Sequence, residues 1–172
     1  MKNPGVIALR AVEDALAVVG THETAEDNHG PEVRQYLESV GLPEGNPWCM
    51  AFVIFRLKKA AAGLKVDLPP IPFTGYTPAF ANWGKTHNLW IPNNLSGHSQ
   101  VKRGDLVFFY SSGIGRIHHV GIVTGIRPDG VDTVEGNTSG GPGVDANGGG
   151  VFRKTRDWSD IGSQGGFVRL PW

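Results

Sequence analysis

The chain has 172 residues, 40% of them apolar and 9% aromatic, which is enough for one hydrophobic core and excludes a multidomain assembly. Sixteen Lys and Arg residues balance sixteen Asp and Glu residues, and no apolar run approaches the ~20 residues that cross a bilayer, so we expect neither a nucleic-acid partner nor membrane insertion. The single cysteine, Cys49, excludes an internal disulfide and a multi-thiolate metal cluster, which leaves a buried structural thiol or a nucleophile.

The first half of the chain, about residues 5–86, has the periodicity of helices, with apolar and charged side chains on opposite sides. Three helices are predicted: residues 6–19, which Gly20 ends; residues from Pro31 to a stop at Gly41; and residues from Trp48–Cys49 to Gly63. Residues 64–76 are proline-rich and are expected to form an extended connector. Thr77-Pro78 then predicts a fourth, short helix with Thr77 as its N-cap.

The second half, about residues 104–171, changes to short β-rich runs separated by turn residues. Five strands are predicted: residues 104–110, 118–126, 131–135, 150–154 and 166–170. Residues 136–150 are rich in glycine and are expected to be a mobile surface loop. Helices followed by strands predict an α+β fold in which the helices pack on one antiparallel sheet, within a single domain of residues 1–172.

Cys49 lies where the third predicted helix begins. At a helix N-terminus the positive end of the helix dipole favours the thiolate, which is the reactive form of cysteine. The free backbone N–H groups there can also stabilise an oxyanion. Position alone leaves a second interpretation open, because an isolated cysteine among apolar residues is commonly an inert packing residue.

A thiol nucleophile needs a base, and the chain has six histidines. Those at positions 22, 29, 87 and 98 lie in polar segments typical of surface imidazoles, whereas His118 and His119 open an apolar strand. Strand alternation places His119 and Gly121 on one face and His118 on the other, so the two histidines are not expected to share a zinc ion with Cys49. Because Gly121 leaves room for another backbone, we expect the helix that carries Cys49 to approach there and His119 to meet the thiol. A buried structural role stays open for either histidine.

An imidazole base is usually oriented by a carboxylate or an amide on its second nitrogen. Glu135 and Asn137 follow the next predicted strand, and they share a face if that strand continues, so either can lie beside His119. Asp105 is a competing partner, although a turn role is favoured for its Gly-Asp pair. The sequence therefore predicts a Cys49–His119 pair that Glu135 or Asn137 orients.

Four short segments carry a family resemblance: NPWCMAFV at residues 46–53, GDLV at 104–107, HVGIV at 119–123 and EGN at 135–137. In this order they resemble the CHAP family, the cysteine, histidine-dependent amidohydrolases/peptidases, which belong with the NlpC-type enzymes of the papain-like group. Weaker likeness at residues 20–33 and 167–171 extends the resemblance over most of the chain. It implies a papain-like fold with N-terminal helices packed against a C-terminal antiparallel sheet of about five to six strands.

The resemblance implies a cysteine amidase or peptidase that cuts amide bonds of bacterial peptidoglycan and so lyses the cell wall. By analogy Cys49 attacks the amide carbonyl to form a thioester, and His119 accepts the thiol proton and returns it to the leaving amine. Glu135 or Asn137 fixes the imidazole. The bond cut, an N-acetylmuramoyl-L-alanine amide or a stem-peptide bond, is not specified.

Two further residues enter through the same resemblance as candidates for oxyanion or substrate binding. Tyr36 stands where some NlpC-type enzymes carry a hydroxyl donor, although a core tyrosine is the favoured interpretation. Trp48 stands before the cysteine, where some relatives have glutamine, so the side-chain part of the oxyanion hole is unassigned.

Some CHAP enzymes bind calcium through acidic loops, and Glu23, Glu26 and Asp27 form a local acidic cluster. Their spacing lacks the alternate-acid pattern of a calcium loop, so a solvated loop is favoured and no cofactor or metal is expected. Two other functions stay open. One is a non-catalytic wall-binding or interaction module on the same fold, which five tryptophans support, and the other is papain-like hydrolysis of another amide.

Peptidoglycan is the expected partner of a monomeric protein, together with an immunity protein if the chain is a delivered antibacterial effector. Arg10, Glu13 and Asp14 interrupt any signal-peptide core near the N-terminus. We therefore expect synthesis in the cytoplasm and action on the cell wall after phage lysis, as an endolysin, or after delivery by a secretion system.

Overall fold

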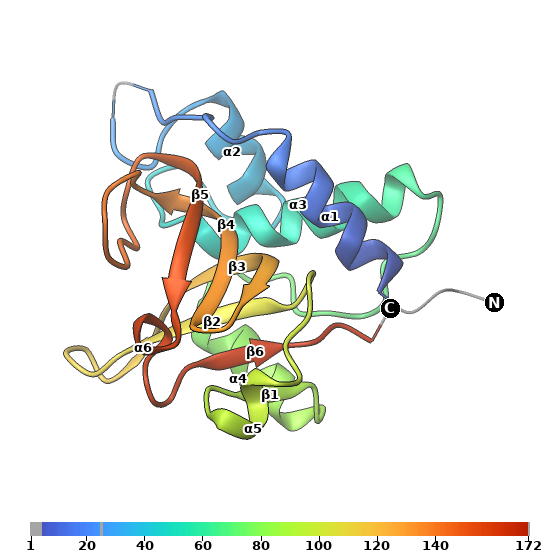
Figure 1. The fold of residues 1–172 in the computed structure, drawn as a ribbon. Coiled ribbons are helices and arrows are strands. Elements are labelled where there is room, and N and C mark those ends of the chain that lie inside the picture. Colours follow the sequence, from blue (N-terminus) through green and yellow to red (C-terminus); the bar gives the residue numbers. More distant parts are fainter. Residues whose placement is uncertain (1–4, 25, 172) are drawn as a thin grey trace.

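Four helices occupy the first half of the chain in the computed structural model, which describes residues 5–24 and 26–171 (Figure 1). They are α1 (Val6–Leu16), α2 (Pro31–Glu38), α3 (Cys49–Gly63) and α4 (Thr77–Thr86). The bounds of α3 match the sequence prediction. By contrast, α1 and α2 end before Gly20 and Gly41, which adopt positive φ angles of 97° and 76° in the turns that follow. Thr77 is already helical and Tyr76 takes the cap position, so the predicted N-cap role of Thr77 is wrong.

The second half forms one sheet with the strand order β1-β6-β2-β3-β4-β5. The strands are β1 (Trp90–Pro92), β2 (Leu106–Ser111), β3 (Arg116–Arg127), β4 (Gly130–Thr138), β5 (Gly150–Asp157) and β6 (Gly166–Val168). All neighbouring pairs are antiparallel, which confirms the α+β fold with the helices first and the sheet second. Because β4 continues to Thr138, residues 136–138 are buried in the sheet, and the glycine-rich loop begins at residue 139 rather than at 136.

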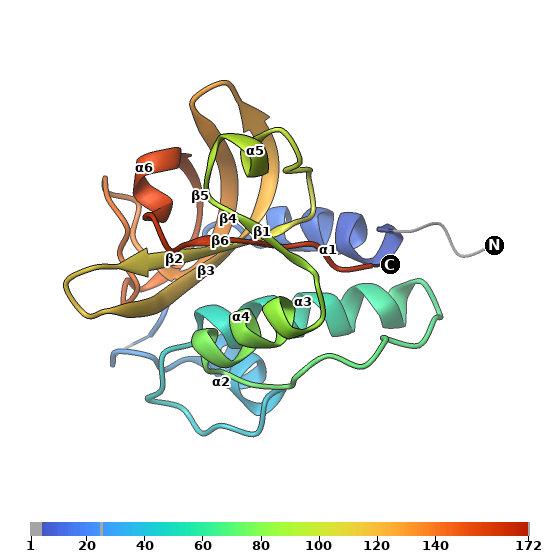
Figure 2. The ribbon, with the colours of Figure 1, turned by 90° about the horizontal axis from the view of Figure 1, so that it is seen from below.

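Helices cover both faces of the sheet. Figure 2 shows α2, α3 and α4 on one face and the short helices α5 (Leu95–His98) and α6 (Trp158–Ile161) on the other. Successive residues of β2 enter two different cores: Phe108 packs with Phe52 and Phe80 on the α3 side, and Phe109 packs with Phe167 on the far side. Burial on both faces explains why the β2 sequence, LVFF, shows no apolar–polar alternation. Within the described residues, no helix has the length and apolar character that crossing a bilayer requires.

The N-terminus of α3 approaches the sheet at a different glycine from the one that the sequence predicts. A Cβ atom on Gly121 would lie 2.7 Å from Cγ of Glu135, so the space at Gly121 holds that side chain and not a helix. A Cβ atom on Gly136 would lie 2.7 Å from Cγ of Phe52 and 2.8 Å from Cζ3 of Trp48. The close approach of α3 therefore depends on Gly136 in β4, and the expectation for Gly121 is wrong.

Candidate active site

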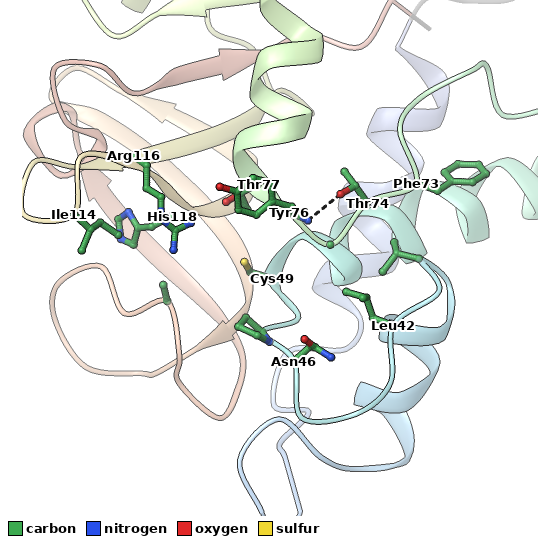
Figure 3. A pocket seen from close by; sticks show the side chains of 14 residues that line it. Leu42, Asn46, Cys49, Phe73, Thr74, Tyr76, Thr77, Ile114, Arg116 and His118 are labelled. Atoms are coloured by element: carbon green, nitrogen blue, oxygen red, sulfur yellow. Dashed lines mark hydrogen bonds between the residues drawn. The ribbon is translucent and has the colours of Figure 1, made fainter.

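Cys49 is the first residue of α3 and lines a cleft of about 550 Å³. Figure 3 shows its sulfur between two walls, one formed by residues 73–77 and the other by Arg116 and His118 of β3. Cys49 is 3% exposed, and no side chain of the described residues caps the helix at this end. The free N–H groups of the first turn and the positive end of the helix dipole therefore create a positive electrostatic potential at the thiol.

His119 lies beside Cys49 with its ring fully buried. Its Nε2–H donates to Oε2 of Glu135 over 2.8 Å. Among the described residues, Nδ1 has no hydrogen-bond partner. Burial by itself would lower the pKa of His119, but the nearby Cys49 thiol and the bond to the Glu135 carboxylate outweigh it and raise the pKa to about 9. The imidazole therefore lies between the thiol and the carboxylate, and it is a protonated imidazolium cation at neutral pH.

Glu135 accepts four hydrogen bonds inside the sheet. His119 and Nη2 of Arg156 bond to Oε2, the latter over 2.5 Å, while Nε of Arg156 (2.8 Å) and the hydroxyl of Thr133 (2.6 Å) bond to Oε1. Burial by itself would raise the pKa of Glu135, but the hydrogen bonds from Arg156 and His119 lower it to about 2. The carboxylate therefore stays charged over the whole physiological range.

Arg156 on β5 completes the buried network, and sequence reasoning missed it. Arg156 is 1% exposed, and its side chain donates hydrogen bonds to both carboxylate oxygens of Glu135. Its Nη1 also donates to the carbonyl of Gly143 in the 139–149 loop. Its guanidinium also lies 5.2 Å from the centroid of the Phe109 ring. The available signal was Glu135 itself, because an acidic residue in a buried strand requires a cationic or metal partner.

Asn137, the alternative orienting residue, forms no hydrogen bond with His119 in the part of the chain that the structure describes. Its side chain is fully buried, and Nδ2 donates to the carbonyl of Ala146 over 3.3 Å. The backbone at Asn137 adopts a positive φ of 56°, next to an irregularity in the pairing of β4 with β5. The structure therefore brings Glu135 to the imidazole, while Asn137 contacts the 139–149 loop.

The structure places Trp48 and Tyr36 outside the cleft. The indole Nε1–H of Trp48 donates to Oε1 of Glu23 over 2.7 Å, and the residue is fully buried. Tyr36 is 2% exposed and its ring packs against Trp48 and Phe52, with ring centroids 5.5 and 5.4 Å apart. The two side chains therefore pack in the buried core beside the first turn of α3 and do not line the cleft.

Asp105 and the acidic cluster lie elsewhere. Asp105 accepts from the backbone N–H of Lys102 over 2.8 Å and from Arg169 over 2.7 Å, as the turn interpretation predicts. Glu23 is bonded to Trp48, and the carboxylate of Glu26 lies 3.9 Å from the ring of His29. In the part of the chain that the structure describes, no three metal-binding side chains gather at one point.

A family model described as the CHAP domain matches residues 41–137, which is more than half of the chain. The matched region includes Cys49, His119, Glu135 and Asn137, whereas Arg156 lies outside it. Searches of curated proteins and of solved structures each found no match.

Proposed function

The chain belongs to the CHAP family, whose members are peptidoglycan amidases and peptidases, and on this premise we propose that it is a cysteine amidohydrolase that cuts a peptidoglycan amide bond. Cys49 is the proposed nucleophile, His119 the proposed general acid and base, and Glu135 the residue that positions the imidazole. The bond is an N-acetylmuramoyl-L-alanine amide or a bond of the stem peptide.

One observation carries the proposal: a buried imidazole that is bonded to Glu135 through Nε2, has no hydrogen-bond partner at Nδ1 among the described residues, and lies close enough to the Cys49 thiol for the thiol to raise its pKa. A purely structural histidine needs no thiol at its second nitrogen, and a purely structural cysteine needs no cleft in front of its sulfur. An imidazolium held beside a thiol favours the thiolate, which attacks a carbonyl far more readily than the thiol does.

The reaction follows from these positions. The sulfur of Cys49 adds to the amide carbonyl, and the oxyanion that forms lies near the backbone N–H groups of the first turn of α3. His119 donates its proton to the nitrogen of the leaving amine as the C–N bond breaks, which leaves a thioester on Cys49. A water molecule then attacks the thioester while His119 accepts its proton, and the free acid departs with the thiolate restored.

The test is digestion of purified peptidoglycan by the intact protein and by Cys49→Ala and His119→Ala. Both variants should lose turbidity reduction and soluble-fragment release, and mass spectrometry of the fragments produced by the parent protein identifies the bond cut. His87→Ala is the matched control, because His87 is exposed and bonds within its own helix region, to the carbonyl of Trp83. Full activity in Cys49→Ala would contradict the proposal.

A further inference from the structure

The cleft in front of Cys49 has an unbalanced charge. Of the described residues that line it, only Arg116 carries a permanent charge, and no acidic side chain lines it. No described acidic residue forms an ion pair with Arg116. His118, the other ionisable wall residue, has its pKa lowered by burial and then by the neighbouring His119 and Arg116. At neutral pH the walls around the Cys49 sulfur therefore present one cation and no carboxylate.

The guanidinium of Arg116 lies over an aromatic ring of the opposite wall. Arg116 begins β3, and its guanidinium carbon lies 5.9 Å from the centroid of the Tyr76 ring, which belongs to the connector before α4. Stacking on an aromatic face leaves the N–H edge of a guanidinium free to bind an anion. Figure 3 shows Arg116 and Tyr76 on either side of the space that the Cys49 sulfur faces.

The rest of the cleft suits a peptide. Three of its wall residues are large apolar side chains that are more than half exposed: Phe73 at 54%, Tyr76 at 55% and Ile114 at 55%. Exposed apolar side chains that gather at a concave site are typical of a ligand-binding surface. Apolar walls with a single cation beside a nucleophile favour a ligand that combines aliphatic groups with one carboxylate.

We propose that Arg116 is a specificity-determining residue that binds a free carboxylate of the substrate, so that the cleft selects an acidic peptide over the same peptide with a carboxamide. A guanidinium donates two parallel hydrogen bonds to a carboxylate, whereas a carboxamide offers a single neutral acceptor. The peptide nature of the substrate rests on the proposed function, but the anion site itself is independent of hydrolysis.

The single cysteine allows the anion site to be measured without turnover. The rates at which iodoacetate and iodoacetamide alkylate Cys49 compare an anion with a neutral reagent of nearly the same shape. Arg116→Gln should lower the iodoacetate rate about threefold or more relative to the iodoacetamide rate, and Arg116→Lys should retain part of the preference. Added salt should reduce the preference in the parent protein. Arg153→Gln, which removes an exposed arginine on β5, should leave the ratio unchanged.

Hydrolysis provides the second measurement. With stem peptides that differ only in a carboxylate or carboxamide, Arg116→Gln should raise KM for the acidic peptide about tenfold and thereby remove the discrimination. If Arg116→Gln leaves both the alkylation ratio and the discrimination between the two peptides unchanged, the inference about Arg116 is overturned. The proposed function would still stand in that case if Cys49→Ala abolishes hydrolysis. A shifted alkylation ratio in a protein that cuts no peptidoglycan would uphold the anion site and overturn the proposed function.

Discussion

Nε2 of His119 lies 2.8 Å from Oε2 of Glu135, and both side chains are completely excluded from solvent. This buried bond fixes the orientation of the imidazole and, with the neighbouring Cys49 thiol, holds its pKa at about 9 despite the opposing effect of burial. In the proposed mechanism the imidazole is the acid that protonates the leaving amine, so the pH at which it loses its proton should limit the reaction at the alkaline end.

Replacing Glu135 should move that alkaline limit. In the parent protein kcat/KM should fall as the pH rises through about 9, because His119 then loses the proton that it transfers. Glu135→Gln removes the negative charge that favours the imidazolium, so the alkaline limb should move to lower pH, by about one unit or more. The measurement is kcat/KM for peptide hydrolysis over a pH series. An alkaline limb at the same pH in both proteins would show that Glu135 does not control the protonation of His119.

Much of the candidate site could be predicted from local sequence. The bounds of α3 follow from its apolar circumference and Gly63, and strand alternation places His119 on the face that meets Glu135. The choice between Glu135 and Asn137 could not be made from sequence, because both were assigned to one face. An irregularity in β4 and a positive φ at Asn137 separate their side chains, and neither feature has a pattern in the residues.

Other parts of the site depend on contacts between distant segments. Arg156 lies 21 residues after Glu135, on a strand where a basic residue would ordinarily be expected to face solvent. The sequence places the close approach of α3 at Gly121 and not at Gly136, because a glycine shows that something approaches closely but not which element does so. β1 was missed because three residues are too few to show a period.

Removing Arg156 should destabilise the fold. Arg156→Gln would leave the Glu135 carboxylate buried without its bidentate partner, which typically costs about 3–5 kcal/mol of unfolding free energy. Arg156→Lys should lose less, because a lysine keeps the charge but not the two parallel bonds. Urea denaturation followed by circular dichroism measures the loss.

The same strand provides the control for Arg156. Arg153 is exposed on the opposite face of β5, so Arg153→Gln should leave the urea midpoint essentially unchanged. If both substitutions lower the midpoint equally, the burial of the Arg156–Glu135 pair is not the source of the stability.

Gly136→Ala should disturb the site through the position of α3. The added methyl group would lie 2.7 Å from Cγ of Phe52 and 2.8 Å from Cζ3 of Trp48, and both belong to buried rings with little space to move. Overpacking of this kind typically costs about 1–3 kcal/mol. Because Trp48 directly precedes Cys49, hydrolysis and alkylation of the thiol should both slow.

Gly63→Ala is the matched control, since Gly63 lies at the other end of α3 and its added methyl group would have its nearest neighbour, an Arg10 nitrogen, at 3.8 Å. There alanine should be neutral or stabilising by up to about 1 kcal/mol, because it favours the helix. Equal thermal midpoints for the Gly136 and Gly63 variants would mean that β4 and α3 can separate without cost.

The His119–Glu135 pair should also give stability a distinct dependence on pH. His119 has a folded-state pKa of about 9, above its ordinary value of 6.5, so its contribution is complete below pH 6.5 and is lost as the pH rises through 9. Glu135 has a folded-state pKa of about 2, below its ordinary 4.5, so its contribution is complete above pH 4.5 and is lost as the pH falls through 2. The free energy of unfolding should therefore be highest near pH 5–6 and decline on the alkaline side with a slope of up to about 1.4 kcal/mol per pH unit.

Urea unfolding from pH 5 to 9.5 tests the alkaline decline, and His119→Gln isolates its source. That variant keeps a hydrogen-bond donor near Glu135 but has no proton to lose, so it should be less stable than the parent protein at pH 6 and should approach it in stability by pH 9.5. The other histidines serve as the comparison, because His87→Gln alters an exposed ring and should preserve the parent slope. A decline that persists in His119→Gln and disappears in His87→Gln would assign the linked proton to the surface and not to the buried pair.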